Sequence, residues 1–89
     1  MRIISQDETV NIPFNTAVLW IKYASSGCEI CAVTNSGIYF TMGIYSTKER
    51  ACKVMRCLNF QYEGSINEEG LSQIFDFPQD RASIDNWDY

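Results

Sequence analysis

The four cysteines are the residues best suited to chemistry in this sequence. Cys28 and Cys31 form a C-x-x-C motif, and Cys52 and Cys57 follow five residues apart. A zinc site would need all four thiolates to converge, but Cys52 and Cys57 are expected about 140° apart on a helix. Cys28 and Cys31 should face opposite sides of a strand, whereas a redox C-x-x-C normally opens a helix. We interpret the cysteines as small buried apolar residues, with metal or redox chemistry as the weaker alternative, and we predict no cofactor.

The sequence contains no histidine, so the commonest general base is missing. An enzyme would need paired carboxylates or an activated cysteine instead. The adjacent Glu68 and Glu69 lie in a polar segment without an evident partner. These observations favour a protein that binds something over an enzyme.

Basic side chains cluster between residues 48 and 56, which hold four of the seven lysines and arginines. Arg50, Lys53 and Arg56 are spaced three apart and should form one stripe on a helix. Such a stripe can hold a phosphate or an acidic protein surface, and arginine is suited to bidentate contacts. The alternative is a solvated face opposite the apolar one.

Aromatic residues are the second candidate for binding. Trp20 should share a strand face with Lys22, and Tyr39 and Tyr45 should share a face of a later strand. Aromatic rings beside cations suit stacking on nucleotides. We therefore count Trp20 and Tyr45 with the basic stripe as predicted ligand-binding residues, the alternative being a core or dimer contact.

The pattern of the chain predicts an α+β fold. An N-terminal antiparallel β-meander should be packed by one main α-helix, followed by a short C-terminal strand and a polar tail. The expected strands span 2–5, 10–12, 17–23, 28–34, 38–45 and 74–77.

Two finer predictions concern the last meander strand and the helix. Alternation over 38–45 predicts one apolar face with Ile38, Phe40, Met42 and Ile44, and an opposite face with Tyr39, Thr41, Gly43 and Tyr45. The helix should begin at Ser46, which forms a capping box with Glu49, and should end at Gly64. Its apolar residues should pack on the sheet; they are Ala51, Val54, Met55, Leu58 and Tyr62.

Length and charge limit the remaining possibilities. A chain of 89 residues suits a single domain, which we place at 1–80, with a polar acidic tail at 81–89. The first ten residues do not resemble a signal peptide, and no stretch has the roughly 20 apolar residues of a membrane span. We therefore expect a cytoplasmic protein without membrane contact. The net charge of −4 argues against general nucleic-acid binding.

Three segments resemble short proteins of phages and mobile elements of Gram-positive bacteria. These are the opening MRIISQD, the segment YSTKERA that starts the predicted helix, and the closing FDFPQD. Those proteins usually continue the opening with Gly-Thr and reach a Pro-Tyr pair, where this chain has Glu8-Thr9 and Pro13-Phe14. The group is similar to the Thoeris anti-defence 1 family.

The resemblance implies a non-catalytic anti-defence protein that sequesters a cyclic ADP-ribose immune signal in the bacterial host cytosol. It also implies an N-terminal sheet, C-terminal helices and ligand pockets between subunits of a homo-oligomer. The alternative is a small inhibitor that binds a host defence protein through its acidic region from Glu63 to Tyr89, with Trp87 as an anchor. A third possibility is an accessory protein of a mobile element that binds no small molecule.

Overall fold

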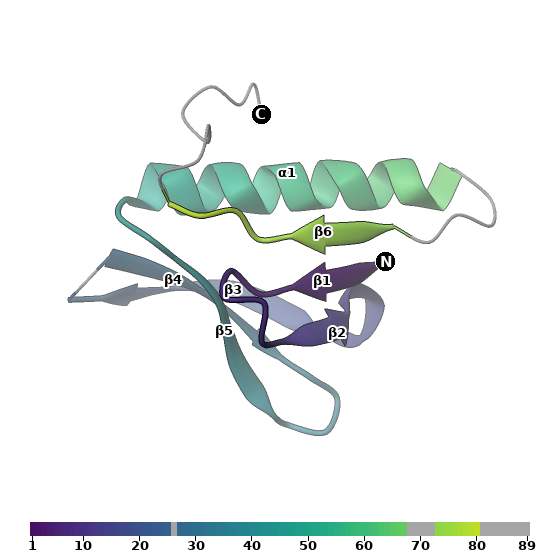
Figure 1. Ribbon diagram of the computed structural model, residues 1–89, viewed down its shortest axis with the longest axis horizontal. Helices are drawn as coiled ribbons and strands as arrows, with labels where there is room; N and C mark the ends of the chain where they lie inside the picture. Colours follow the sequence, from purple (N-terminus) through teal and green to yellow (C-terminus); the bar gives the residue numbers. More distant parts are fainter. Residues whose placement is uncertain (26, 68–72, 81–89) are drawn as a thin grey trace.

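Two three-stranded sheets and one long helix make up the structure (Figure 1), a computed structural model that describes residues 1–25, 27–67 and 73–80. The architecture is α+β with an N-terminal strand meander, as the sequence predicts. The predicted tail at 81–89 lies outside the described residues.

The larger sheet is the predicted antiparallel meander. It contains β3 (Val18–Ala24), β4 (Gly27–Val33) and β5 (Tyr39–Tyr45), with β4 in the centre. Directly opposed residues of paired strands lie on the same face, so the rows Trp20–Cys31–Thr41 and Leu19–Ala32–Phe40 belong to opposite faces. The second row faces the core.

The smaller sheet joins the two ends of the described chain. Its order is β2 (Asn11–Pro13), β1 (Arg2–Ile4) and β6 (Ile74–Asp76), and a short 3-10 helix, η1 (Phe14–Thr16), follows β2. The hairpin of β1 and β2 and the late strand confirm the prediction. The parallel pairing of β6 with β1 is a long-range contact that local patterns do not indicate.

The helix α1 (Lys48–Asn67) begins and ends later than predicted. Its N-cap is Thr47, whose hydroxyl accepts a hydrogen bond from the amide of Arg50 at 3.2 Å. Ser46 instead faces the C-terminal segment, so the predicted capping box with Glu49 is wrong. Gly64 is helical rather than a stop; a glycine in a helix costs about 1 kcal/mol without ending it.

A β-bulge overturns the predicted faces of β5. Ile30 is paired with Gly43 and the next residue, Cys31, with Thr41, so Met42 is one residue extra in β5. An extra residue reverses the alternation beyond it, which exposes Ile44 and buries Tyr45 completely. The prediction that Tyr45 shares a face with Tyr39 is therefore wrong. A Cβ on Gly43 would lie 2.8 Å from the Tyr45 ring, so the residue after the bulge needs to be a glycine.

One apolar core lies between the two sheets and the helix. The helix contributes Ala51, Val54 and Leu58, all fully buried, and Met55 packs at the edge of the cluster. Tyr62 packs against Phe14 in a tilted arrangement, with ring centroids 4.7 Å apart. The predicted apolar side of the helix is thus confirmed. In the described part of the chain, no helix combines the length and apolar character that a membrane crossing requires.

Candidate functional site

A cationic hollow lies on the side of α1 that faces away from the core. It is lined by Lys48, Glu49, Cys52, Lys53 and Arg56, and its volume is about 300 Å³. The spacing explains the grouping, because residues four apart are neighbours on a helix surface. Three cations and one carboxylate therefore share a small concave surface, which we call the helix hollow.

Two of the three predicted stripe residues, Lys53 and Arg56, lie in the helix hollow. The sequence prediction missed Lys48 and Glu49, although their i, i+4 relation to Cys52 and Lys53 could have revealed them. Arg50 is not among the lining residues. The helix hollow therefore holds part of the predicted stripe together with Lys48 and Glu49, and Arg50 lies outside it.

Arg50 holds the C-terminal segment against the start of the helix. Its guanidinium donates to the carboxylate of Asp80 at 3.3 Å, to the Asp80 carbonyl at 3.2 Å and to the Ser46 hydroxyl at 3.1 Å. Burial alone would raise the pKa of Asp80. The amide and hydroxyl of Ser46 together with Arg50 outweigh it and lower that pKa.

Tyr45 is a core residue with one polar contact. Its ring is fully buried, and its hydroxyl donates to the carbonyl of Pro78 at 2.9 Å. Burial, followed by the charge of Asp80, raises the pKa of Tyr45. The side chain has no exposed surface to offer a ligand in this conformation. Its buried position follows from the bulge, which a single-sequence alternation pattern does not reveal.

Trp20 lies in a second hollow, on the outer face of the meander sheet. This aromatic hollow of about 300 Å³ is lined by Trp20, Lys22, Cys31, Tyr39, Phe40 and Thr41. The rings of Trp20 and Tyr39 meet edge to face with centroids 5.9 Å apart, a favourable aromatic geometry. Trp20 and Lys22 share the face that the sequence predicted.

The predicted ligand-binding residues are thus dispersed within one subunit. Lys53 and Arg56 lie on the outer side of the helix, and Trp20 lies on the sheet face that points away from the core. Arg50 is engaged with Asp80, and Tyr45 is inside the core. The helix hollow and the aromatic hollow cannot both contact one small ligand unless two subunits meet.

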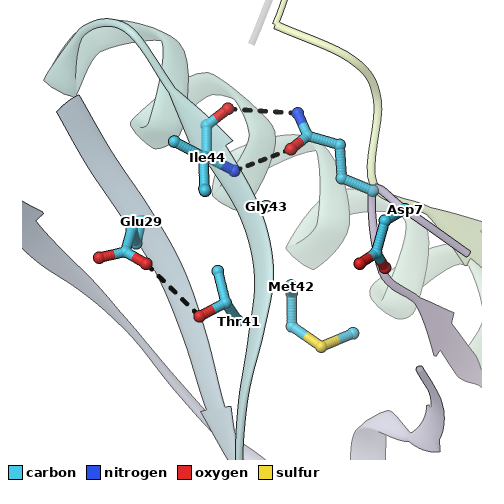
Figure 2. Close-up of a pocket in the computed structure, with 7 residues that line it drawn as sticks. Asp7, Glu29, Thr41, Met42, Gly43 and Ile44 are labelled. Atoms are coloured by element: carbon cyan, nitrogen blue, oxygen red, sulfur yellow. Dashed lines mark hydrogen bonds between the residues drawn. The ribbon is translucent and has the colours of Figure 1, made fainter. Parts of the chain in front are cut away.

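A third hollow, of about 230 Å³, lies where β5 meets the turn after β1 (Figure 2). The Gln6 side chain extends the sheet there: its Oε1 accepts from the Ile44 amide at 3.0 Å, and its Nε2 donates to the Ile44 carbonyl at 3.2 Å. Figure 2 also shows Thr41 donating to Glu29 across the strands, at 3.4 Å. No sequence motif marked this hollow as a site.

Asp7 on the rim of this hollow is committed to its own turn. Its carboxylate accepts from the hydroxyls of Ser5 and Thr9, each at 2.7 Å, and from the Thr9 amide at 3.1 Å. These bonds, led by the one from Ser5, lower the pKa of Asp7 to about 2. The carboxylate therefore shapes the turn rather than serving as a proton carrier.

The cysteines occupy separate environments. Cys28 lies in the apolar core, whereas Cys31 lies under the aromatic hollow, where burial raises its pKa. Cys52 lines the helix hollow and Cys57 packs beside the core. Within residues 1–25, 27–67 and 73–80, no group of three or more acidic or cysteine side chains is placed to hold a metal ion.

Comparison with known proteins gives no relative for this chain. No family model, no curated protein and no solved structure matches it. The resemblance to the Thoeris anti-defence 1 family stays a prediction from the sequence segments alone.

Proposed function

We propose that this protein is a non-catalytic, phage-type anti-defence protein that sequesters a nucleotide immune signal, of cyclic ADP-ribose type, in the cytosol of a bacterial host. The observation that carries the proposal is the helix hollow. Lys48, Lys53 and Arg56 place three positive charges around one concavity of a chain whose net charge is −4. A local positive field on an acidic protein favours a small anion over a nucleic-acid backbone.

Phosphate is the anion that best suits these side chains. Arginine can make two parallel hydrogen bonds to a phosphate, and lysine adds a mobile point charge. The carboxylate of Glu49 in the same hollow repels a highly charged anion, so the hollow favours a ligand with few phosphates. A molecule of cyclic ADP-ribose type, which carries a single diphosphate, fits this charge balance.

The size of the helix hollow supports a site shared between subunits. Ligand pockets usually have volumes of roughly 300–1,000 Å³ and enclose most of the ligand. The helix hollow, at about 300 Å³, is at the lower limit of that range. A second subunit would cover the rest of a nucleotide, and its aromatic hollow carries the Trp20 and Tyr39 rings on which a base could stack.

Sequestration needs affinity and stoichiometry, and no reaction. The absence of histidine from the chain supports this part of the proposal. After incubation with the purified protein and heat denaturation, the ligand should be recovered intact by chromatography. A hydrolysed product would contradict the non-catalytic role while leaving binding in place.

A thermal-shift screen with linear and cyclic nucleotides, including isomers of cyclic ADP-ribose, tests the binding itself. A ligand at 100 times its dissociation constant adds about 2.7 kcal/mol to the stability. In a domain of this size that corresponds to a rise in Tm of more than about 10 °C. No rise with any cyclic nucleotide would remove the proposal.

A further inference from the structure

The strand β3 is an open edge of the meander sheet. It pairs with β4 on one side, and within the described chain its backbone forms no hydrogen bond on the other side. An edge strand leaves a row of N–H and C=O groups that can pair with another strand. The opposite edge, β5, is already capped by the amide and side chain of Gln6.

The composition of β3 gives this edge little of the usual protection. Proteins blunt exposed edges with short strands, proline, bulges or charged side chains, lysine above all. The edges of the smaller sheet follow that rule: β2 and β6 have three residues each, and they contain Pro13 and Asp76. In contrast, β3 has seven residues with the sequence VLWIKYA and a single charge, on Lys22.

Two large apolar residues of β3 are left in solvent, one near each end. Val18 and Tyr23 are each 64 % exposed. They point to opposite faces of the sheet, because their positions differ by an odd number. Neither the helix nor the smaller sheet covers them. Apolar side chains of β3 are therefore exposed on both faces of the sheet.

We propose that β3 pairs in antiparallel fashion with β3 of a second copy of this chain, about a two-fold axis at Ile21. The two three-stranded sheets would then form one continuous sheet of six strands. This proposal goes beyond the proposed function, because it names a subunit contact that leaves the helix hollows and the aromatic hollows on opposite sides of the joined sheet. It rests on that function only for the expectation that the chain self-associates.

The register follows from the alternation of the strand. Opposed residues always lie on the same side of the joined sheet, so the inner faces of both copies stay on one side only if the numbers of the opposed β3 residues have an even sum. An axis at Ile21 pairs all seven residues, whereas an axis at Trp20 or at Lys22 pairs fewer. An axis at Lys22 would also oppose two like charges, which is destabilising.

The register about Ile21 is self-complementary. It places Trp20 opposite Lys22 of the second copy twice, on the outer face, where the ring can attract the ammonium group. It places Leu19 opposite Tyr23 twice, on the inner face. Within its own subunit Lys22 is already opposite Glu29 in β4, so its charge is balanced from that side.

The sign of a charge at position 20 tests this register. Trp20→Lys and Trp20→Glu remove the same ring and add one charge each. In the proposed dimer, residue 20 of each copy is opposite Lys22 of the other. Trp20→Lys therefore creates two repulsive lysine pairs, whereas Trp20→Glu creates two attractive pairs. Trp20→Lys also makes the acidic chain less negative, so general charge repulsion predicts the reverse order.

Sedimentation of the ligand-free protein over a wide concentration range measures the association, and circular dichroism confirms that each variant is folded. We expect a wild-type dimer, and a dissociation constant about tenfold or more higher for Trp20→Lys than for Trp20→Glu. Amide exchange should show protection at every residue of β3 in the wild type, and at alternate residues only in Trp20→Lys.

Three results would overturn the proposal. They are a wild-type monomer at all concentrations, equal association of both variants, and exchange at alternate β3 amides in a wild-type dimer. Because no nucleotide is present, failure here leaves the binding proposal standing. Conversely, a dimer that binds no nucleotide would retain this contact and remove the proposed function.

Discussion

Replacing Tyr45 with phenylalanine tests whether this tyrosine is a structural residue. The change removes one hydroxyl from a fully buried ring and thereby the 2.9 Å bond to the Pro78 carbonyl. That carbonyl also accepts from Gln6 Nε2 at 3.0 Å, so it keeps one partner in the variant. The loss is therefore that of one net hydrogen bond, about 0.5–1.5 kcal/mol, without an orphaned acceptor.

Thermal or denaturant unfolding measures this loss. In a domain of this size, about 1 kcal/mol corresponds to a fall in Tm of roughly 4–8 °C. Tyr39→Phe is the matched control, because Tyr39 is 70 % exposed and donates no hydrogen bond that the structure shows. It should change the stability by less than about 0.5 kcal/mol. Equal effects of the two substitutions, or a loss of ligand affinity without loss of stability in Tyr45→Phe, would refute the reasoning.

Further predictions concern the bulge, the helix and two carboxylates. In a denaturant titration, Gly43→Ala should lower the unfolding free energy by about 1–3 kcal/mol, since the new methyl would press on the Tyr45 ring. In the same titration, Gly64→Ala should raise the unfolding free energy by up to about 1 kcal/mol, because its methyl meets no other atom. Because the pKa of folded Asp7 is lowered to about 2, its contribution is present above pH of about 4 and is lost as the pH falls toward 2. Asp7→Asn should therefore flatten the pH dependence of unfolding in that window, and an unchanged slope would contradict the assigned cause. Asp80→Asn should also lower stability at neutral pH, by at most about 1 kcal/mol because its pair with Arg50 is partly exposed.

Local patterns were sufficient for the elements that repeat with a simple period. The meander strands, the hairpin of β1 and β2, and the apolar side of α1 all follow from alternation or helical spacing. The errors occur where one extra residue or one tertiary contact breaks the period. Met42 shifts the faces of β5, and a single sequence carries no marker of a bulge beyond the glycine that follows it.

The candidate site was harder to predict than the fold. The three-residue spacing correctly placed Lys53 and Arg56 on one side of the helix. It could not show that Arg50 contacts Asp80, thirty residues further along the chain. Tyr45 was misplaced because its face depends on the bulge. The separation of the helix hollow from the aromatic hollow depends on which sheet face the helix covers, and that choice is made by long-range packing.

Opposite changes of charge in the helix hollow provide the most direct test of the proposed function. Calorimetric titration would compare the wild type with Arg56→Gln and Glu49→Gln, using the cyclic nucleotide that gives the largest thermal shift. Losing a cation should weaken binding by about tenfold, and losing the carboxylate should strengthen it by a smaller factor. If both variants bind as tightly as the wild type, the helix hollow of Lys48, Lys53 and Arg56 is not the ligand site.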